Sequence, residues 1–428
     1  MKKKILILGL GYVGITLFAA LMKKNKKYEL YGVDKSKDLI KNLKNKKFIT
    51  YEKNLLNIFE KYKNDNIFFD NQINNNVKYD IVIICVGTPI KTNKKINDKF
   101  LFDAIRDVSK SIKNNSLIII RSTVKVGTTK NIYTFLNKIT KIKFHIAFCP
   151  ERTIEGNAIE EITKLPQLVG CLNKDTKKLT TDFFKILTNK IIFFETFEEP
   201  ELIKLLDNSY RDSKFAFANQ VAIICEQLNL NTKKIIQKAN KNFGRNAIPL
   251  PGPVGGPCLS KDPYILDQST KKNSSLITQS RKVNEKYVEL FSNKIIKYSK
   301  KLNKNYINFS IIGISFKGNP DTNDIRDSTA LKIIEKIKYE FPNSKIYIFD
   351  KFVEIKKIKN LDCIKINTID NCFKKNVCVI HGNNQYIKSI DINKKLNNNK
   401  KVYVFDFWDN FSKIISPANK KRYSGLGI

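Results

Sequence analysis

Residues 5–16 read Ile-Leu-Ile-Leu-Gly-Leu-Gly-Tyr-Val-Gly-Ile-Thr, and the fold class can be predicted from them. Four consecutive apolar residues indicate a strand that is buried on both faces of a parallel sheet. In the turn that follows, Gly9 permits the tight bend, Gly11 lets the backbone meet a pyrophosphate, and Gly14 lets the next helix pack closely. This order of strand, turn and helix predicts a Rossmann-like domain with a dinucleotide site.

Asp34 supports the same interpretation from the end of the second predicted strand. It lies 20 residues after Gly14, where a carboxylate can accept hydrogen bonds from ribose hydroxyls. This favours NAD over NADP, although the neighbouring Lys35 weakens the preference. Tyr12 and Val13, inside the glycine turn, complete the cofactor contacts that we expect from this part of the chain.

The alternation of apolar runs and helical stretches predicts an α/β protein in three parts. An NAD-binding domain is expected over residues 1–199, with strands at residues 5–8, 30–33, 81–86, 117–120 and 144–148. Residues 200–300 show no strand pattern, so we expect a central helical domain with one long helix from about residue 201 to 228. A smaller Rossmann-like domain is expected over residues 301–428, with strands at 309–312, 345–349, 377–380 and 402–405.

The formal net charge of +38 is the strongest feature of the composition. Such a charge occurs in proteins that bind nucleic acid or anionic membranes. Here, however, Lys greatly outnumbers Arg and is spread along the chain, whereas a surface that follows phosphates more often shows Arg clusters with exposed aromatic residues. We therefore expect a solvated lysine-rich surface, with neither a nucleic-acid nor a membrane partner.

Eight cysteines without a Cys-x-x-Cys pair favour a reducing compartment over a disulfide framework or a zinc site. Only two histidines are present, which excludes most His-based triads and metal sites, so no metal is expected. The basic start and the apolar residues 5–22 resemble a signal peptide, but this stretch holds the glycine turn. No run long enough to span a bilayer follows, so a cytoplasmic protein is expected.

Polar side chains follow three predicted strands of the first domain. Thr88 and Thr123 can reach cofactor or an ordered water, because the carboxyl ends of parallel strands line the ligand crevice. Glu151 and Arg152 come after the strand at 144–148 and are expected near the same crevice. Taken singly, Thr88, Thr123 and Glu151 also suit the start of a following helix.

The long helix presents a polar stripe made of Lys204, Asn208 and Arg211, which share one face because of their spacing. Two cations and an amide on one stripe can orient an anionic substrate and stabilise developing negative charge. A merely solvated basic stripe is the alternative in so lysine-rich a chain.

Cys258 lies in residues 251–263, Pro-Gly-Pro-Val-Gly-Gly-Pro-Cys-Leu-Ser-Lys-Asp-Pro. Glycines such as Gly255 let the backbone approach a ligand while the prolines keep the loop stiff. Lys261 offers a cation that favours the thiolate, and Asp262 offers a carboxylate for proton transfer. The thiol is therefore predicted to be reactive rather than structural.

Residues 313–328 again leave a predicted strand and enter a predicted helix. Lys317, Arg326 and the helix N-terminus suit a nucleotide diphosphate, and Asp324 and Asp327 could hold Arg326 in position. The last domain is thus predicted to bind a second nucleotide.

Together these stretches resemble the nucleotide-sugar dehydrogenases, which oxidise a UDP-hexose to its uronic acid. The resemblance runs in order along the chain, through Gly9–Gly14, 87–89, 122–124, 150–151, Lys204 with Asn208, 255–258 with Asp262, and 316–317 with Arg326. It implies NAD in the first domain, UDP in the last domain, and a homodimer joined through the central helices.

The resemblance also implies a reaction that consumes two NAD per sugar. The first oxidation gives an aldehyde that Cys258 attacks as a thiolate, the second gives a thioester, and water releases the uronate. Lys204 and Asn208 are expected to stabilise the oxyanion. Asp262 and Glu151 are candidate general bases, with Thr123 holding a water for the proton transfer.

Further substrate contacts are expected from Arg152, Gly255 and the residues of the polar stripe. Arg245 is similar in position to an arginine that reaches the sugar of the neighbouring subunit in this family. Residues 208–212 and 251–253 look like members that handle UDP-N-acetylmannosamine, and Arg211 could supply the polar partner of the N-acetyl group. The Gly-Gly-x-Cys-x-x-Lys-Asp form looks more like the UDP-glucose members. UDP-N-acetylmannosamine is therefore expected first, with UDP-glucose and UDP-N-acetylglucosamine as alternatives.

Three other interpretations remain as alternatives. One is an enzyme relative that has lost activity, although every proposed catalytic residue is present. An alcohol dehydrogenase that stops at the aldehyde would keep the glycine turn and Lys204 but would not need Cys258. A basic RNA-binding or membrane-binding protein would explain the charge but would leave Cys258, Lys204 and Asp262 together as a coincidence.

Overall fold

The structure is a computed structural model that describes residues 2–24, 28–48, 51–62, 65–270, 275–302, 304 and 306–427. It divides into two compact units. Unit 1 holds the described residues of Met1–Asp207 and Tyr264–Asn273, and unit 2 holds those of Asn208–Pro263 and Ser274–Ile428. The three domains predicted from the sequence, with boundaries at residues 199 and 300, are a separate division of the chain and stay a prediction.

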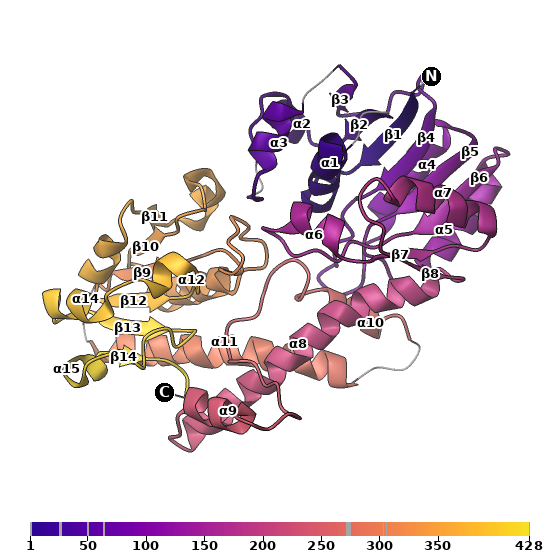
Figure 1. The fold of residues 1–428 in the computed structure, drawn as a ribbon. Coiled ribbons are helices and arrows are strands. Elements are labelled where there is room, and N and C mark those ends of the chain that lie inside the picture. The colour runs from indigo at the N-terminus through magenta and orange to yellow at the C-terminus, as the bar shows by residue number, and fades with distance from the viewer. Residues whose placement is uncertain are drawn as a thin grey trace. The chain divides into compact units, whose positions relative to one another are not determined.

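Unit 1 is built on an eight-stranded sheet in the order β3-β2-β1-β4-β5-β6-β7-β8 (Figure 1). All neighbouring strands are parallel except β6 and β7, which meet through one antiparallel pair, Phe148 with Gly170. The strands are β1 Lys3–Leu8, β2 Tyr28–Val33, β3 Ile67–Asp70, β4 Tyr79–Ile84, β5 Ile112–Ile120, β6 Phe144–Phe148, β7 Gln167–Gly170 and β8 Ile191–Phe194. The helices are α1 Tyr12–Lys24, α2 Lys37–Lys44, α3 Leu55–Lys61, α4 Lys99–Ser109, α5 Thr128–Ile139, α6 Ala158–Lys164 and α7 Lys174–Phe184.

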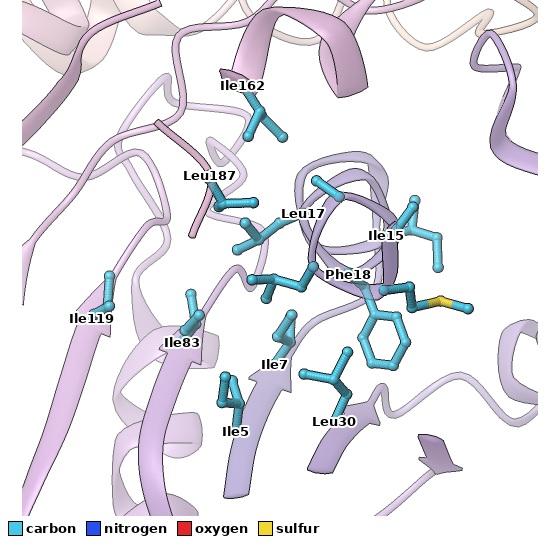
Figure 2. Close-up of a cluster of buried hydrophobic side chains, with 14 of the residues drawn as sticks. Ile5, Ile7, Ile15, Leu17, Phe18, Leu30, Ile83, Ile119, Ile162 and Leu187 are labelled. Atoms are coloured by element: carbon cyan, nitrogen blue, oxygen red, sulfur yellow. The ribbon is translucent and has the colours of Figure 1, made fainter. Parts of the chain in front are cut away.

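The apolar run at the start of the chain forms β1, the strand between β2 and β4. Ile5 faces Leu30 of β2 and Ile81 of β4 in register. Figure 2 shows Leu17 and Phe18 of α1 among branched side chains of these strands, and both are completely buried. Burial of this apolar surface stabilises the sheet and fixes the start of α1 at the carboxyl end of β1.

The five strands predicted for the first domain are confirmed, with ends that differ by up to five residues. The prediction at 81–86 extended too far, because β4 ends at Ile84 and Val86 turns to accept a hydrogen bond from Ser122 Oγ at 2.7 Å. The short strands β3, β7 and β8 were not predicted. Each has only four residues, and so short a run does not show a period that separates strand from helix.

Helix α8, Glu198–Gln227, is the predicted long helix, and it passes from unit 1 into unit 2 between Asp207 and Asn208. Its first turn carries three glutamates, which the positive end of the helix dipole favours. The other helices of the central region are α9 Thr232–Asn240, α10 Asp262–Asp267 and α11 Ser275–Lys301. As predicted, the described residues between 200 and 300 contain no strand.

Unit 2 contains a six-stranded parallel sheet in the order β11-β10-β9-β12-β13-β14. Its strands are β9 Phe309–Ile312, β10 Ile346–Phe349, β11 Ile364–Lys365, β12 Val377–Ile380, β13 Tyr403–Asp406 and β14 Tyr423–Ser424, so the four predicted strands are confirmed. Its helices are α12 Thr329–Glu340, α13 Gln385–Lys388, α14 Ile392–Asn398 and α15 Pro417–Lys420, with 3-10 turns η1 Ile355–Lys357, η2 Lys359–Leu361 and η3 Ile369–Lys374.

The described residues contain neither a membrane-spanning helix nor a cluster of metal ligands. None of the helices there has both the length and the apolar character needed to cross a membrane. No group of three or more His, Cys, Asp or Glu side chains there is arranged to hold a metal ion.

Candidate active site

The glycine turn between β1 and α1 has the geometry that the sequence predicts for a nucleotide cradle. Gly9 adopts a φ of +91°, and a Cβ there would lie 2.8 Å from the backbone of Cys85. A Cβ at Gly14 would lie 1.9 Å from the carbonyl oxygen of Gly9, so the helix rests directly on the turn. A Cβ at Gly11 would meet no atom within 4 Å. The turn is therefore closed on the protein side at two glycines and open at the third, where a ligand can approach.

Asp34 lies beside this turn at the end of β2. Its carboxylate accepts hydrogen bonds from the N–H groups of Leu10, at 2.8 Å, and Ser36, at 2.9 Å. These bonds fix the carboxylate next to the glycine turn, and the side chain is only partly buried. Oxygen lone pairs remain for a ribose hydroxyl, as the predicted role requires.

Tyr12 is tied to a residue that the sequence analysis did not identify, Glu52. The Tyr12 hydroxyl donates to the Glu52 carboxylate and accepts from the Gly156 N–H at 2.9 Å. Glu52 also accepts from the N–H groups of Gly156 and Ile159, at 3.0 and 3.1 Å. The first turn of α1 is thereby fastened to the segment after β6. The sequence around Glu52 could not predict this contact, because Glu52 and Gly156 are more than 100 positions apart.

Thr88 and Thr123 meet at the carboxyl ends of β4 and β5. The Thr88 hydroxyl donates to the Thr123 carbonyl at 2.5 Å, and Thr88 is buried. The structure thus brings the two predicted threonine loops together, and this bond leaves the hydroxyl of Thr123 for other partners.

Glu151 is buried against Arg121, the residue that directly follows β5. The Arg121 guanidinium bonds the Glu151 carboxylate, the Cys149 carbonyl at 3.1 Å and the Gln167 side chain at 2.9 Å. The other Glu151 oxygen accepts from the Arg152 and Thr153 N–H groups at 2.8 Å.

These contacts set the charge of Glu151. Burial alone would raise its pKa, but the Arg121 guanidinium and the Thr153 N–H outweigh burial and hold the pKa below its ordinary value. The Lys204 ammonium acts in the same direction, which places Lys204 in the electrostatic field of Glu151. A carboxylate in this state is a weak base, so the surroundings of Glu151 favour an orienting role over proton transfer.

Arg152, expected at the substrate, forms a two-pronged ion pair with Asp207 of α8. Its Nε lies 2.6 Å from Asp207 Oδ2, and its terminal nitrogen lies 3.2 Å from Oδ1. The pair holds the segment after β6 against α8 one turn beyond Lys204. Both side chains remain about one-third exposed, so this pair is open to solvent and to ligands.

In unit 2, the segment that carries Cys258 is joined to α8 by a buried hydrogen bond. Asn208 Nδ2 donates to Asp262 Oδ2 at 2.6 Å, and Lys261 Nζ lies 2.8 Å from Asp262 Oδ1. Asp262 is completely buried, whereas Cys258 is exposed. The structure therefore brings Asn208, Lys261 and Asp262 together at the segment that carries the exposed Cys258, and their catalytic roles stay predictions.

Lys261 remains cationic in this position. Burial works against its charge, but the Asp262 carboxylate and the Cys258 sulfur outweigh burial and raise the pKa of Lys261 above its ordinary value. A fixed ammonium close to a thiol stabilises the thiolate, which is the nucleophilic form of cysteine.

The loop after β9 carries the predicted cations. Arg326 is held by Asp324, whose Oδ2 lies 2.9 Å from the arginine Nε, and the Lys317 ammonium lies 5.7 Å from the ring centre of Phe316. Asp327 contacts the cysteine segment instead: its carbonyl accepts from the Gly256 N–H at 2.9 Å, and its carboxylate accepts from Ser260. A Cβ at Gly255 would lie 2.5 Å from that same carbonyl, so only glycine fits there.

Arg211 and Arg245 are both exposed. Arg211 is on α8 next to Asp212, and it is Asp212 that turns inward and is completely buried. The Arg245 guanidinium lies 4.9 Å from the ring centre of Phe243. The expected substrate roles of these two arginines stay predictions.

Arg121 and Arg281 are functional candidates that the sequence analysis missed. Both are almost fully buried, and each bonds a buried carboxylate and backbone carbonyl groups. One signal was available: only 8 of the 78 basic residues are arginine. In a chain that prefers lysine, each arginine marks a place where a planar, multiply bonding cation is needed.

Three family models match the chain in sequence order. They describe the NAD binding domain, the central domain and the UDP binding domain of the UDP-glucose/GDP-mannose dehydrogenase family, and they match residues 3–188, 198–286 and 310–413.

Curated relatives cover most of the chain. A UDP-N-acetyl-D-mannosamine dehydrogenase of Methanococcus vannielii is 32% identical over 388 residues, which are 87% of each chain. One of Methanocaldococcus jannaschii is 33% identical over 355 residues, 82% of this chain and 79% of the relative.

Solved structures share the fold. The UDP-D-ManNAc dehydrogenase of Pyrococcus horikoshii superimposes with a TM-score of 0.86 at 24% identity, covering 99% of both chains. A UDP-glucose dehydrogenase of Pyrobaculum islandicum superimposes with a TM-score of 0.84 at 19% identity, covering 100% of this chain and 98% of that one.

Proposed function

The chain belongs to the UDP-glucose/GDP-mannose dehydrogenase family, and on that premise we propose that it oxidises C6 of UDP-N-acetyl-D-mannosamine to the acid with two NAD per sugar. The observation that carries the four-electron reaction is the exposed thiol of Cys258 beside Lys261, Asp262 and Asn208. A dehydrogenase that stops at the aldehyde has no use for this arrangement.

The glycine turn fits NAD, because its backbone is open at Gly11 and a carboxylate lies beside it at Asp34. When bound, NAD takes a hydride from C6 in each oxidation. Gly9, Gly11, Tyr12, Val13 and Gly14 would hold the dinucleotide, together with Asp34, Thr88 and Thr123.

The first oxidation needs a base for the C6 hydroxyl proton. Glu151 is poorly suited to this role because Arg121 holds its pKa low; Asp262 is the other candidate base, and Thr123 would orient a water for the transfer. Lys204 and Asn208 would stabilise negative charge on the substrate oxygen.

Cys258 then adds to the aldehyde carbon. Its thiolate forms the C–S bond, and the carbonyl electrons move to oxygen, where a cation and an amide donor stabilise the oxyanion. Loss of the second hydride from this carbon gives a thioester on Cys258. Water attacks the thioester, the C–S bond breaks, and the products are the uronate and the regenerated thiolate. Lys261 supports the thiolate at both ends of this sequence.

The UDP part of the substrate would bind through Lys317, Arg326 and the backbone at Gly255. Glu151, Arg152 and Arg211 would contact the sugar, and Arg245 would do so from a second subunit. Two cations on the loop after β9 match the charge of a diphosphate.

We include a homodimer in this proposal because of an apolar stripe along α8. Tyr210, Phe217 and Ile224 lie on α8 and Leu228 directly follows its last residue. They are spaced by seven, seven and four residues, and each is more than 40% exposed. A stripe of this spacing on a long helix is self-complementary when two copies pack together. We expect Phe217→Glu to give a monomer in light scattering, while Lys282→Glu on α11 stays dimeric. A dimeric Phe217→Glu protein would contradict the role of the stripe.

UDP-glucose is the second candidate substrate, because the Gly-Gly-x-Cys-x-x-Lys-Asp form resembles members that use it. The relatives named as UDP-N-acetyl-D-mannosamine dehydrogenases support the first candidate. The cytoplasmic location that the cysteine pattern predicts stays part of the proposal, and cell fractionation tests it.

The decisive experiment supplies excess NAD and limiting UDP-N-acetylmannosamine and counts the NADH formed per sugar. Two NADH per sugar are expected, and Cys258→Ser should stop after the first. Turnover of UDP-glucose alone would overturn the substrate, and full acid production by Cys258→Ser would overturn the thioester route.

A further inference from the structure

The backbone that carries Cys258 is held from inside the protein by buried polar side chains of α8 and α11. We call residues 250–261 the cysteine loop. On its N-terminal side, Gly252 exchanges two hydrogen bonds with Asn219 of α8. The Gly252 N–H donates to Asn219 Oδ1 at 2.9 Å, and Asn219 Nδ2 donates to the Gly252 carbonyl at 3.1 Å. Asn219 is completely buried, so it acts as a fixed clamp for this part of the loop.

Arg281 of α11 holds the loop on both sides of the cysteine. One of its terminal nitrogens donates to the Val254 carbonyl at 3.0 Å, and the other donates to the Leu259 carbonyl at 3.4 Å. The second nitrogen also lies 2.6 Å from Asp212 Oδ1 of α8. Val254 precedes Cys258 by four residues and Leu259 follows it directly, so a single planar guanidinium spans the reactive residue.

Asn284 joins these two anchors into one network. Its Nδ2 donates to Asp212 Oδ1 at 2.8 Å, and its Oδ1 accepts from Asn219 Nδ2 at 2.8 Å. Asn219, Asn284, Asp212 and Arg281 are each at most 2% exposed. Burying an ion pair costs free energy that apolar side chains of similar size would not cost. The stability of the two helices alone therefore does not explain the network, whereas the position of the loop does.

The opposite side of the cysteine loop is fixed by the C-terminal part of unit 2. The Gly256 N–H bonds the Asp327 carbonyl, and a Cβ at Gly256 would lie 2.3 Å from the ring of Phe316. A Cβ at Gly252 would lie 2.2 Å from the ring of Trp408. The loop is therefore held from two sides while the thiol stays accessible.

We propose that Arg281, assisted by Asn219, is a positioning residue that sets the Cys258 thiol for capture of the aldehyde. The kinetic part of this inference rests on the proposed function. Displacement of a reacting atom by about 1 Å can cost on the order of 100-fold in rate. A loop that loses one of its anchors therefore captures the aldehyde more slowly, and part of the aldehyde escapes.

The test compares wild type with Arg281→Lys, in which the ammonium can still neutralise Asp212 but cannot reach both carbonyl groups at once. We expect kcat to fall about 10- to 100-fold, with KM for the UDP-sugar within about twofold. Each aldehyde that escapes has yielded one NADH and no uronate, so the NADH formed per uronate should rise above two. A purely structural role would not change this ratio in folded protein.

A second measurement does not depend on the substrate. The rate of alkylation of Cys258 by iodoacetamide, followed by peptide mass analysis, should change at least about threefold in Arg281→Lys. Cys363, which is half-buried and not on the cysteine loop, serves as the internal reference. If wild type oxidises no UDP-sugar, the proposed function fails, and this measurement still decides the positioning role.

The matched control is Lys294→Met. Lys294 also joins α11 to α8, through Glu226 Oε1 at 2.7 Å, and it bonds the Gly425 carbonyl rather than the cysteine loop. The Lys294→Met variant should be less stable than wild type but should still form two NADH per uronate. If Arg281→Lys does not fold, Asn219→Ala replaces it, since that change leaves no buried charge unpaired. An unchanged NADH ratio and an unchanged alkylation rate in a folded variant would overturn the proposal.

Discussion

The two sheets of this chain use the same backbone arrangement at the carboxyl ends of strands β1 and β9. The order β3-β2-β1-β4-β5 in unit 1 matches β11-β10-β9-β12-β13 in unit 2. Gly9 after β1 and Gly313 after β9 both have a positive φ, +91° and +78°. Each glycine donates its N–H to the end of the neighbouring strand, Gly9 to Val33 at 2.8 Å and Gly313 to Phe349 at 2.9 Å.

The carboxylates beside these turns differ in what they leave for a ligand. Asp34 follows β2 and accepts from the N–H groups of Leu10 and Ser36. Asp350 follows β10 in the equivalent place, is buried, and accepts from four N–H groups, those of residues 314, 315, 352 and 353. The same residue type is thus available at the first turn and saturated by the backbone at the second.

The connections also differ. Helix α1 begins at Tyr12, three residues after Gly9, whereas α12 begins at Thr329, after a loop that carries Lys317 and Arg326. A short glycine turn offers backbone to a dinucleotide, and a longer loop can place cations around a diphosphate. Similar sheets therefore acquire different ligands through the segment that follows one strand.

The largest effect is expected from a substitution at the close contact between the glycine turn and helix α1. Gly14→Ala would place a Cβ 1.9 Å from a backbone oxygen and should destabilise unit 1 by more than about 3 kcal/mol in thermal unfolding. Gly11→Ala is the control. It should change the free energy of unfolding by less than about 1 kcal/mol and should weaken the binding of NAD, measured by calorimetry. Equal stability losses in both variants would contradict the division of roles between these glycines.

The next effect separates the two carboxylates. Asp350→Ala leaves four N–H groups without their acceptor and should cost about 3 kcal/mol of stability in denaturant titration, with NAD affinity unchanged. Asp34→Ala should lower the free energy of unfolding by about 1 kcal/mol and should weaken the binding of NAD about 10-fold. The contrast breaks down if Asp350→Ala weakens NAD as much as Asp34→Ala does.

The cations of the second loop should act on UDP alone. Lys317→Ala should weaken UDP about 10- to 100-fold in calorimetry, because it removes a charge-assisted contact to the diphosphate, and NAD should bind as in wild type. Lys332→Ala on the nearby helix α12 is a charge-matched control. Equal weakening by both variants would mean that general surface charge, rather than the loop, attracts UDP.

The smallest effect concerns how helices near these sites are capped. Ser328 caps α12 with its own side chain, whereas α5 receives the Glu201 carboxylate of α8, which accepts from the N–H groups of Gly127 and Thr129 at 2.6 and 2.8 Å. Burial raises the pKa of Glu201 to about 7, above its ordinary value of 4.5.

Because the folded pKa lies above the unfolded one, the stability that Glu201 contributes is complete below pH 4.5 and is lost as the pH rises through 7. Glu201→Gln should reduce the change in the free energy of unfolding between pH 5 and pH 7 by an amount on the order of 1 kcal/mol, measured by denaturant titration. Parallel curves for wild type and variant would show that Glu201 does not titrate in this range.

Much of the architecture could be predicted from the sequence, because it is encoded over a few neighbouring residues. The strands at 144–148, 309–312 and 377–380 have the predicted ends, and α8 lies within three residues of its predicted bounds. The glycine turn from Gly9 to Gly14 could also be predicted, since the role of each glycine depends on the local backbone geometry. Cys258, Lys261 and Asp262 were found for the same reason, as neighbours in one loop.

The contacts that these residues make could not be predicted from the sequence, because they form only when the chain folds. Glu52 meets Gly156, Glu201 meets Gly127, and Arg281 meets Val254, across 104, 74 and 27 residues of chain. No local pattern marks such partners, because a buried polar group can be satisfied by any donor or acceptor that packing brings within reach. Residue types and their spacing along the chain predicted which groups could carry the chemistry and on which elements they would lie. The folded packing decided which of them are anchored, charged or exposed, because desolvation and hydrogen bonding depend on neighbours that only the fold supplies.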